Sequence, residues 1–114
     1  MTIARTLSSL RIYVRRRDVT RRSGRRQPLA TGIIEAARTA GVEYASAMYG
    51  QEGFAFGDAS SRHLPVCIEL VAAPSDLERF VAEHGELLAG ATLLLTEGTR
   101  ILTDVDALIE SSHR

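Results

Sequence analysis

The sequence predicts a single α+β domain whose strands and helices follow the order βαββαβ. Three observations carry this prediction: an apolar alternation near the N-terminus, two segments with helical apolar spacing, and strand-like runs after each of them. The length of 114 residues suits one domain, and 45% hydrophobic with 25% charged residues is an ordinary globular composition. We therefore treat residues 1–114 as one unit and expect flexible ends at 1–9 and 110–114.

The first half of the chain predicts one strand, one loop and one helix. Apolar residues alternate with polar ones over 10–14, which is the spacing of a strand. Residues 15–27 lack apolar periodicity and are predicted to form a mobile basic loop. A helix is expected to start with Pro28 in its first turn and to end at Gly41, which supplies the C-terminal cap.

A second strand is predicted at 43–50, before a loop rich in glycine, serine and aspartate at 50–62. After this loop the second half repeats the strand–helix–strand pattern, with strands predicted at 65–71 and 91–97. The second helix is expected to open on a capping box formed by Ser75 and Glu78, and His84 is expected on its solvated polar side.

This order predicts a ferredoxin-like sandwich, with a four-stranded antiparallel sheet and two helices on one face. Right-handed crossovers place both helices on the same side of the sheet. The other face would be bare and apolar, so we expect a partner subunit to cover it.

The net charge of zero conceals a strong asymmetry. Residues 1–26 hold nine arginines against one acid, Asp18, and therefore carry nine minus one, or +8. The rest of the chain holds five arginines against thirteen acids, or −8. This polarity indicates an end that attracts anions, or charge complementarity between neighbouring copies.

No residue pattern predicts catalysis, so an enzyme is not expected. Cys67 is interpreted as a packed strand residue, and the lone cysteine suits a reducing, cytoplasmic location. No cofactor is predicted. The alternative of a metal site rests on His63 with Asp58. No apolar stretch is long enough to span a membrane.

Two segments are candidates for holding a small anion, because glycines let backbone N–H groups approach an anion and arginines donate paired hydrogen bonds. The glycine-rich loop offers Gly50, Gly53, Gly57 and Arg62. The basic loop offers Arg15, Arg17, Arg22, Arg25 and Arg26. The basic segment lacks interleaved aromatics, so specific recognition of nucleic acid is not expected, whereas a basic-arm adaptor that docks on anionic surfaces stays open.

Taken together, several motifs resemble the PII-like family catalogued as domain of unknown function one-ninety. The resemblance runs from about Leu10 to Leu95, and its motifs are these: Leu10-Arg11-Ile12-Tyr13, Gly24 before Pro28-Leu29, Ile34-Glu35-Ala36-Ala37-Arg38 with Gly41-Val42 and Ala45, Gly50 with Gly53-Phe54, Ser60-Ser61-Arg62, and Leu64-Pro65-Val66 with Ile68-Glu69-Leu70-Val71.

The resemblance implies a ferredoxin-like homotrimer that binds a small anionic effector, often an adenine nucleotide, between subunits and signals to a protein target through its loops. It implies a role for Phe54, beside Gly53 at the base of the signalling loop, and for Arg100 near the C-terminal arginines of PII proteins. The PII phosphate loop has no counterpart at Leu88-Ala89-Gly90-Ala91-Thr92. A metal-responsive trimer of the cation-tolerance type is the alternative, and neither the effector nor the target is named by the sequence.

Overall fold

The computed structural model describes residues 3–53 and 64–102. They form two helices and six strands, and the main order βαββαβ is confirmed with one additional hairpin. The elements are β1 (Ile3–Arg15), β2 (Val19–Arg22), β3 (Arg25–Pro28), α1 (Leu29–Thr39), β4 (Tyr44–Tyr49), β5 (Pro65–Ala72), α2 (Pro74–Glu83) and β6 (Thr92–Leu102).

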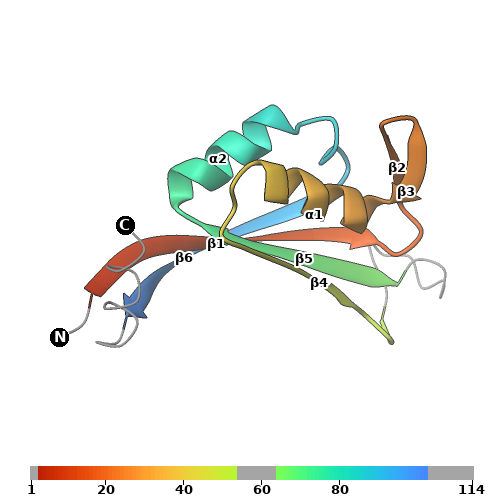
Figure 1. The fold of residues 1–114 in the computed structure, drawn as a ribbon. Coiled ribbons are helices and arrows are strands. Elements are labelled where there is room, and N and C mark those ends of the chain that lie inside the picture. The colour runs from red at the N-terminus through yellow and green to blue at the C-terminus, as the bar shows by residue number, and fades with distance from the viewer. Residues whose placement is uncertain (1–2, 54–63, 103–114) are drawn as a thin grey trace.

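The main sheet has the order β4-β5-β1-β6, and each neighbouring pair is antiparallel. Both helices cover the same face of this sheet (Figure 1). The fold is therefore the predicted ferredoxin-like sandwich. In this sheet β4 lies parallel to β1 with β5 between them, and β6 lies parallel to β5 with β1 between them. This is the arrangement that right-handed crossovers produce.

The core lies between the helices and the main sheet. The register of β1 with β5 places apolar residues of the two strands opposite each other. Leu10 pairs with Leu70, and Ile12 pairs with Ile68. All four face the helices, because alternate residues of a strand point to the same side. Phe80 of α2 and other helix side chains close this layer; the full set of buried residues in the cluster is Leu10, Ile12, Val14, Ala30, Ile33, Ala36, Ala37, Val66, Ile68, Leu70, Ala72, Leu77, Phe80 and Leu88.

The open face of the sheet is more polar than expected. Glu69 lies near its centre, where its Oε2 accepts hydrogen bonds from Ser9 Oγ at 2.8 Å and Arg11 Nε at 3.3 Å. The hydrogen bond to Glu69 raises the pKa of the Arg11 guanidinium above its ordinary value. Exposed apolar side chains surround this ion pair, among them Tyr44, Met48 and Leu94. The face that was expected to be apolar is therefore partly apolar and partly polar.

Two further expectations about the N-terminal part were wrong. Residues 3–9, expected to be flexible, belong to β1, which pairs with β6 from Ile3 onward. The predicted loop at 15–27 contains a β-hairpin, in which Ser23 (φ 53°) and Gly24 (φ 76°) form a two-residue turn. Two consecutive positive φ values are characteristic of a type I′ turn, whose twist matches that of paired strands. The C-terminal end at 110–114 lies outside the described residues.

The second helix begins and ends differently from the prediction. Ala73 is its N-cap, without a side-chain cap hydrogen bond, and Pro74 occupies the first turn. Ser75 therefore lies inside the helix, and the capping box with Glu78 does not form. His84 follows the last helical residue and is half-buried, with its ring stacked on Phe80 at 4.5 Å between centroids. Its Nδ1 lies 2.9 Å from the Phe80 carbonyl oxygen, so this side chain is not simply solvated.

We predict that truncating Ile68 destabilises the protein far more than truncating Val71, which lies in the same strand but on the opposite face of the sheet. Ile68 is fully buried beneath the helices, so Ile68→Ala should lower the free energy of unfolding by about 2–5 kcal/mol. Val71→Ala, on the open face, should cost roughly 1 kcal/mol or less. Chemical denaturation followed by circular dichroism measures both, and equal losses would contradict this position of the core.

Candidate anion-binding site

The hairpin β2–β3 packs closely against helix α1, and the approach is closest at Gly32. Gly32 is buried in the middle of α1, and a Cβ atom there would lie 2.6 Å from Thr20 Cγ2 of the hairpin. Separations this short do not occur for real Cβ atoms. Glycine costs about 1 kcal/mol relative to alanine inside a helix, and here its missing side chain lets the hairpin approach the helix backbone.

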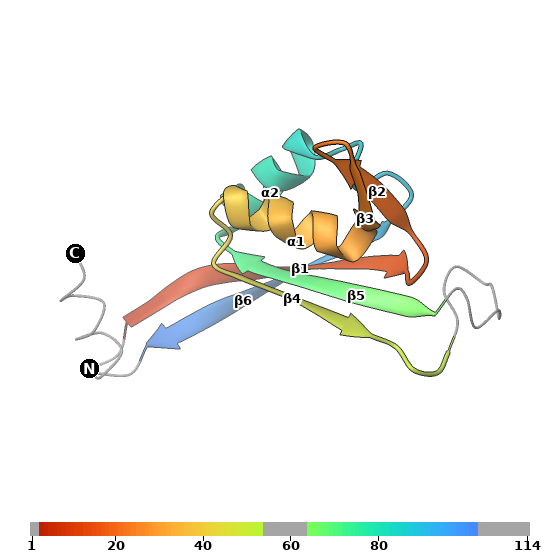
Figure 2. The same cartoon turned by 45° about the vertical axis from the view of Figure 1, so that its right-hand side comes forward.

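Hydrogen bonds and an ion pair hold the same junction. The backbone N–H of Leu29, the first residue of α1, donates to the Asp18 carbonyl at 2.8 Å. Gln27 Nε2 donates to Glu35 Oε2 at 3.2 Å, and Arg22 Nε lies 3.6 Å from the same oxygen. The hairpin is thus fixed to the first half of α1 on its inner side and stands beside it above the sheet (Figure 2).

A pocket of about 410 Å³ opens at the base of this hairpin. Arg15, Arg17 and Arg26 line one part of it, and the turn of residues 89–91 between α2 and β6 lines another. Gly90 in that turn has a φ of 83°, a conformation that favours glycine, and its missing side chain leaves the backbone accessible. We call this the base pocket.

One carboxylate also lines the base pocket, and it is already engaged. Asp18 Oδ1 lies 3.2 Å from Arg15 Nε, and its Oδ2 accepts a hydrogen bond from the Arg15 backbone N–H at 2.9 Å. The Asp18 charge is thereby offset locally, and it orients the Arg15 side chain. Arg17 and Arg26 add two further positive charges, so the base pocket is cationic overall.

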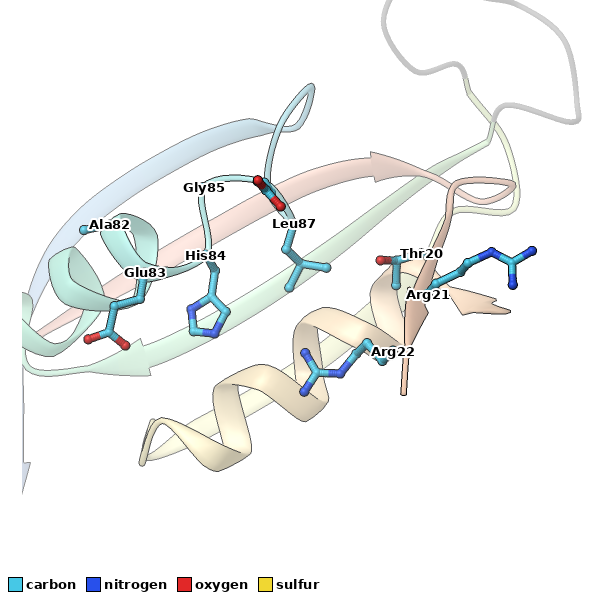
Figure 3. Close-up of a pocket in the computed structure, with 9 residues that line it drawn as sticks. Thr20, Arg21, Arg22, Ala82, Glu83, His84, Gly85 and Leu87 are labelled. Carbon is cyan, nitrogen blue, oxygen red and sulfur yellow. The ribbon is translucent and has the colours of Figure 1, made fainter. Parts of the chain in front are cut away.

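A larger groove of about 730 Å³ lies on the other side of the hairpin and is electrostatically mixed. Figure 3 shows Thr20 and Arg22 across from the end of α2, with Arg22 extending over α1 on the side of His84. Glu83 and Glu86 also line this groove. Their carboxylates oppose the binding of an anion, so the base pocket is the better anion site although it is smaller.

The predicted arginines are divided between two places. Arg15 and Arg17 lie at the base pocket, and Arg22 and Arg25 flank the hairpin turn near Glu35. Arg26 lines both places. For Arg100 the structure describes only the backbone, which pairs with that of Arg5.

The described part of the glycine-rich loop shows a structural role for Gly50. Its N–H donates to the Pro65 carbonyl at 2.9 Å, and a Cβ would lie 3.0 Å from Pro65 Cγ. Gly53 has a φ of 120° and does not line the base pocket. The other candidates of this loop, Phe54, Gly57, Arg62 and the alternative metal ligands Asp58 and His63, lie outside the described residues.

The two predicted segments nevertheless adjoin at one end of the sheet. The backbone N–H of Arg16 donates to the Leu64 carbonyl at 2.8 Å, directly beyond the glycine-rich loop. The Arg16 guanidinium also lies over the Tyr49 ring, 5.7 Å from its centroid. Arg17 follows in the base pocket.

The turn at 89–91 is the part of the pocket that was not predicted from the sequence. It lacks a counterpart of the PII phosphate loop, so it was not expected to bind an anion. The available signal was Gly90 directly after a helix-forming segment, because a glycine at such a position marks a turn with positive φ.

The described ranges contain no group of three or more potential metal-ligating side chains and no helix long and apolar enough to span a membrane. The metal alternative thus gains no support from residues 3–53 and 64–102.

Solved structures of low sequence identity share this fold. CPII from Thiomonas intermedia K12, a nitrogen regulatory PII-like protein, matches in its apo form with a TM-score of 0.64 and 8% identity, over 90% of this chain and 100% of that chain. CPII bound to ADP, AMP and acetate matches with a TM-score of 0.57 and 8% identity, over 89% and 92%. A putative PII-like signaling protein from Thermus thermophilus matches with a TM-score of 0.55 and 9% identity, over 88% and 92%.

The sequence comparisons show the family. Among curated proteins, none matches this chain significantly. A family model does match residues 7–101, from within β1 to the penultimate residue of β6, and its description is "Uncharacterized ACR, COG1993". Because this match covers most of the sequence and agrees with the PII-like fold, the chain belongs to the DUF190 family.

Proposed function

We propose that this chain is a cytoplasmic, PII-like regulatory protein that binds a small anionic effector in the base pocket. The observation that carries the proposal is the meeting of Arg15, Arg17 and Arg26 with the glycine turn at 89–91. Arginine side chains donate paired hydrogen bonds to phosphate or carboxylate oxygens, and accessible backbone groups suit a close-bound anion. This is the chemistry of binding rather than of bond cleavage, so we propose no enzymatic activity.

An adenine nucleotide is the effector to test first. The CPII structures contain ADP and AMP with acetate or bicarbonate, all of which are anions. A phosphate group would fit the arginine-lined part of the base pocket. Arg15 is oriented by Asp18, and the exposed Arg17 and Arg26 are the side chains that would donate to the phosphate.

We further propose that the working unit is a homotrimer whose neighbouring subunit completes the base pocket. The pocket is open to solvent at one side, and exposed Tyr44, Met48 and Leu94 on the sheet offer apolar contact surface. Effector binding would signal to a protein target by favouring one conformation of the adjoining loops. This requires different affinities of the effector for the two loop states.

Isothermal calorimetry with ATP, ADP, AMP and cyclic nucleotides tests the effector. We expect binding of at least one, and we expect Arg17→Ala and Arg26→Ala each to weaken it about tenfold or more, because a hydrogen bond to a charged group contributes about 1.5–3 kcal/mol. Arg38→Ala, on the exposed last turn of α1, removes the same charge away from the pocket and should bind normally. The absence of heat with every nucleotide would refute nucleotide binding.

The packing of the hairpin against α1 is tested by a pair of complementary substitutions, at Gly32 and Thr20. Gly32→Ala should raise helix propensity, yet it should dislodge the hairpin because its Cβ meets Thr20 Cγ2. We expect faster tryptic cleavage at the hairpin arginines and weaker effector binding.

Thr20→Ser removes that methyl group alone, so combining it with Gly32→Ala should restore both protection and binding. Thr20→Ser by itself is the matched control. If trypsin cleaves the Gly32→Ala variant no faster than the unchanged protein, the close approach of Thr20 to Gly32 is not what keeps the hairpin in place.

The trimer is tested by sedimentation equilibrium. We expect a mass three times that of the 12.4 kDa chain, unchanged by moderate salt because the exposed apolar side chains carry the contact. A monomeric mass at micromolar concentration would contradict the trimer without affecting the calorimetric test.

A further inference from the structure

The outer face of the hairpin is exposed and combines apolar with positively charged side chains; two of its residues, Val19 and Arg26, also line the base pocket. Val19 pairs with Pro28 and Arg21 pairs with Arg26, so these four side chains share one face of the two strands. All four are exposed, and Val19, at 49%, is among the large apolar residues most exposed in the described structure. The inner face, with Thr20 and Gln27, is instead packed against α1. We call Val19, Arg21, Arg26 and Pro28 the outer hairpin face.

The positive charge of this face is not compensated locally. Arg21 and Arg26 lie directly opposite each other, and like charges in that position repel. Within residues 3–53 and 64–102, no ion pair reaches either of them, whereas Arg22 on the inner side has Glu35. A carboxylate placed between Arg21 and Arg26 would therefore relieve a repulsion that exists in the free protein.

The outer hairpin face is also accessible as a unit. The hairpin rises beside the start of α1, on the helix side of the sheet and away from its open face (Figures 1 and 2). Arg21 lies at the rim of the groove that contains His84, and its side chain extends away from the His84 ring (Figure 3). Because the inner side lies against α1 where Thr20 approaches Gly32, the outer side faces away from that contact.

The distribution of charge favours a short acidic ligand over an extended polyanion. A protein that binds nucleic acid strongly makes roughly six to ten phosphate contacts. The outer hairpin face supplies two arginines, and Arg15 and Arg17 of the adjoining base pocket add two more. The rest of the chain outside residues 1–26 carries −8 and would repel a polyanion or an anionic membrane that extended past the hairpin. Val19 and Pro28 add an apolar contact, which a bare phosphate backbone would not use.

We propose that the outer hairpin face docks a short acidic segment of a target protein, in which carboxylates flank an apolar residue. The carboxylates bind Arg21 and Arg26, and the apolar side chain rests on Val19 and Pro28. Arginine at the centre of a small apolar patch is a common composition of protein interfaces. The inference builds on the proposed regulatory function by naming the class of partner, but its test needs no effector.

The test uses the full, effector-free chain and a fluorescein-labelled synthetic peptide of alternating glutamate and valine. Fluorescence anisotropy should show binding that weakens with salt. Arg21→Ala should weaken it about tenfold or more, which corresponds to about 1.4 kcal/mol, and Val19→Ser should weaken it several-fold. Arg38→Ala is the matched control and should leave it unchanged. Thermal melts establish that each variant is folded.

Competing partners are separated by three further measurements. A peptide with glutamine in place of glutamate should not bind. A single-stranded DNA oligonucleotide and phosphatidylserine vesicles should bind more weakly than the acidic peptide, and tighter binding of either would overturn the proposal. A changed oligomeric mass of Arg21→Ala would assign this face to contact between subunits and would also overturn it.

No binding of the acidic peptide by the unchanged protein, or an equal loss in the Arg38→Ala control, would refute the proposal directly. Because nucleotide calorimetry is performed without the peptide, the proposed effector function can stand or fall separately.

Discussion

The close approach of the β2–β3 hairpin to helix α1 at Gly32 is the constraint on which the candidate site depends. The hairpin is a two-stranded ribbon, and such ribbons are marginally stable unless they pack against something else. Its strands carry no apolar core of their own. A glycine in the middle of α1 removes the Cβ that would meet Thr20, and the resulting contact, together with the bonds of Glu35, gives the arginines defined positions.

The sheet register then explains why these arginines meet a glycine turn from the other half of the chain. The chain leaves β1 at Arg15, close to where β6 begins at Thr92, because Tyr13 pairs with Thr92. The turn at 89–91 immediately precedes β6 and therefore lies beside the hairpin base. Both βαβ halves of the chain thus contribute to one pocket. The first half supplies arginine side chains, and the second half supplies the backbone of the turn at 89–91.

Much of the fold could be predicted from the sequence because the core residues follow the periods of strands and helices. The hairpin could not, since its inner face packs through Thr20 and Gln27 rather than through apolar alternation, and its outer face mixes Val19 and Pro28 with two arginines. The Ser23-Gly24 pair was the available signal for a turn. The capping box failed for a local reason: Pro74 occupies the first turn, so Ser75 falls inside the helix.

The candidate site was predicted only in part, because its assembly depends on tertiary contacts. The arginine-rich segment was identified, but its division between Arg17 and Arg26 at the base and Arg22 and Arg25 near the turn follows from pairing register. Gly50 is required for a different purpose, because its missing side chain allows a close approach to Pro65. The residues around it in the sequence do not indicate this contact.

The central claim is that an anionic effector binds between the hairpin base and the turn at 89–91. A crystal structure of the protein with ADP tests it most directly. The account predicts phosphate oxygens within hydrogen-bonding distance of Arg17 or Arg26 and beside Gly90. A nucleotide bound elsewhere, with the base pocket empty at saturating ADP, would contradict it.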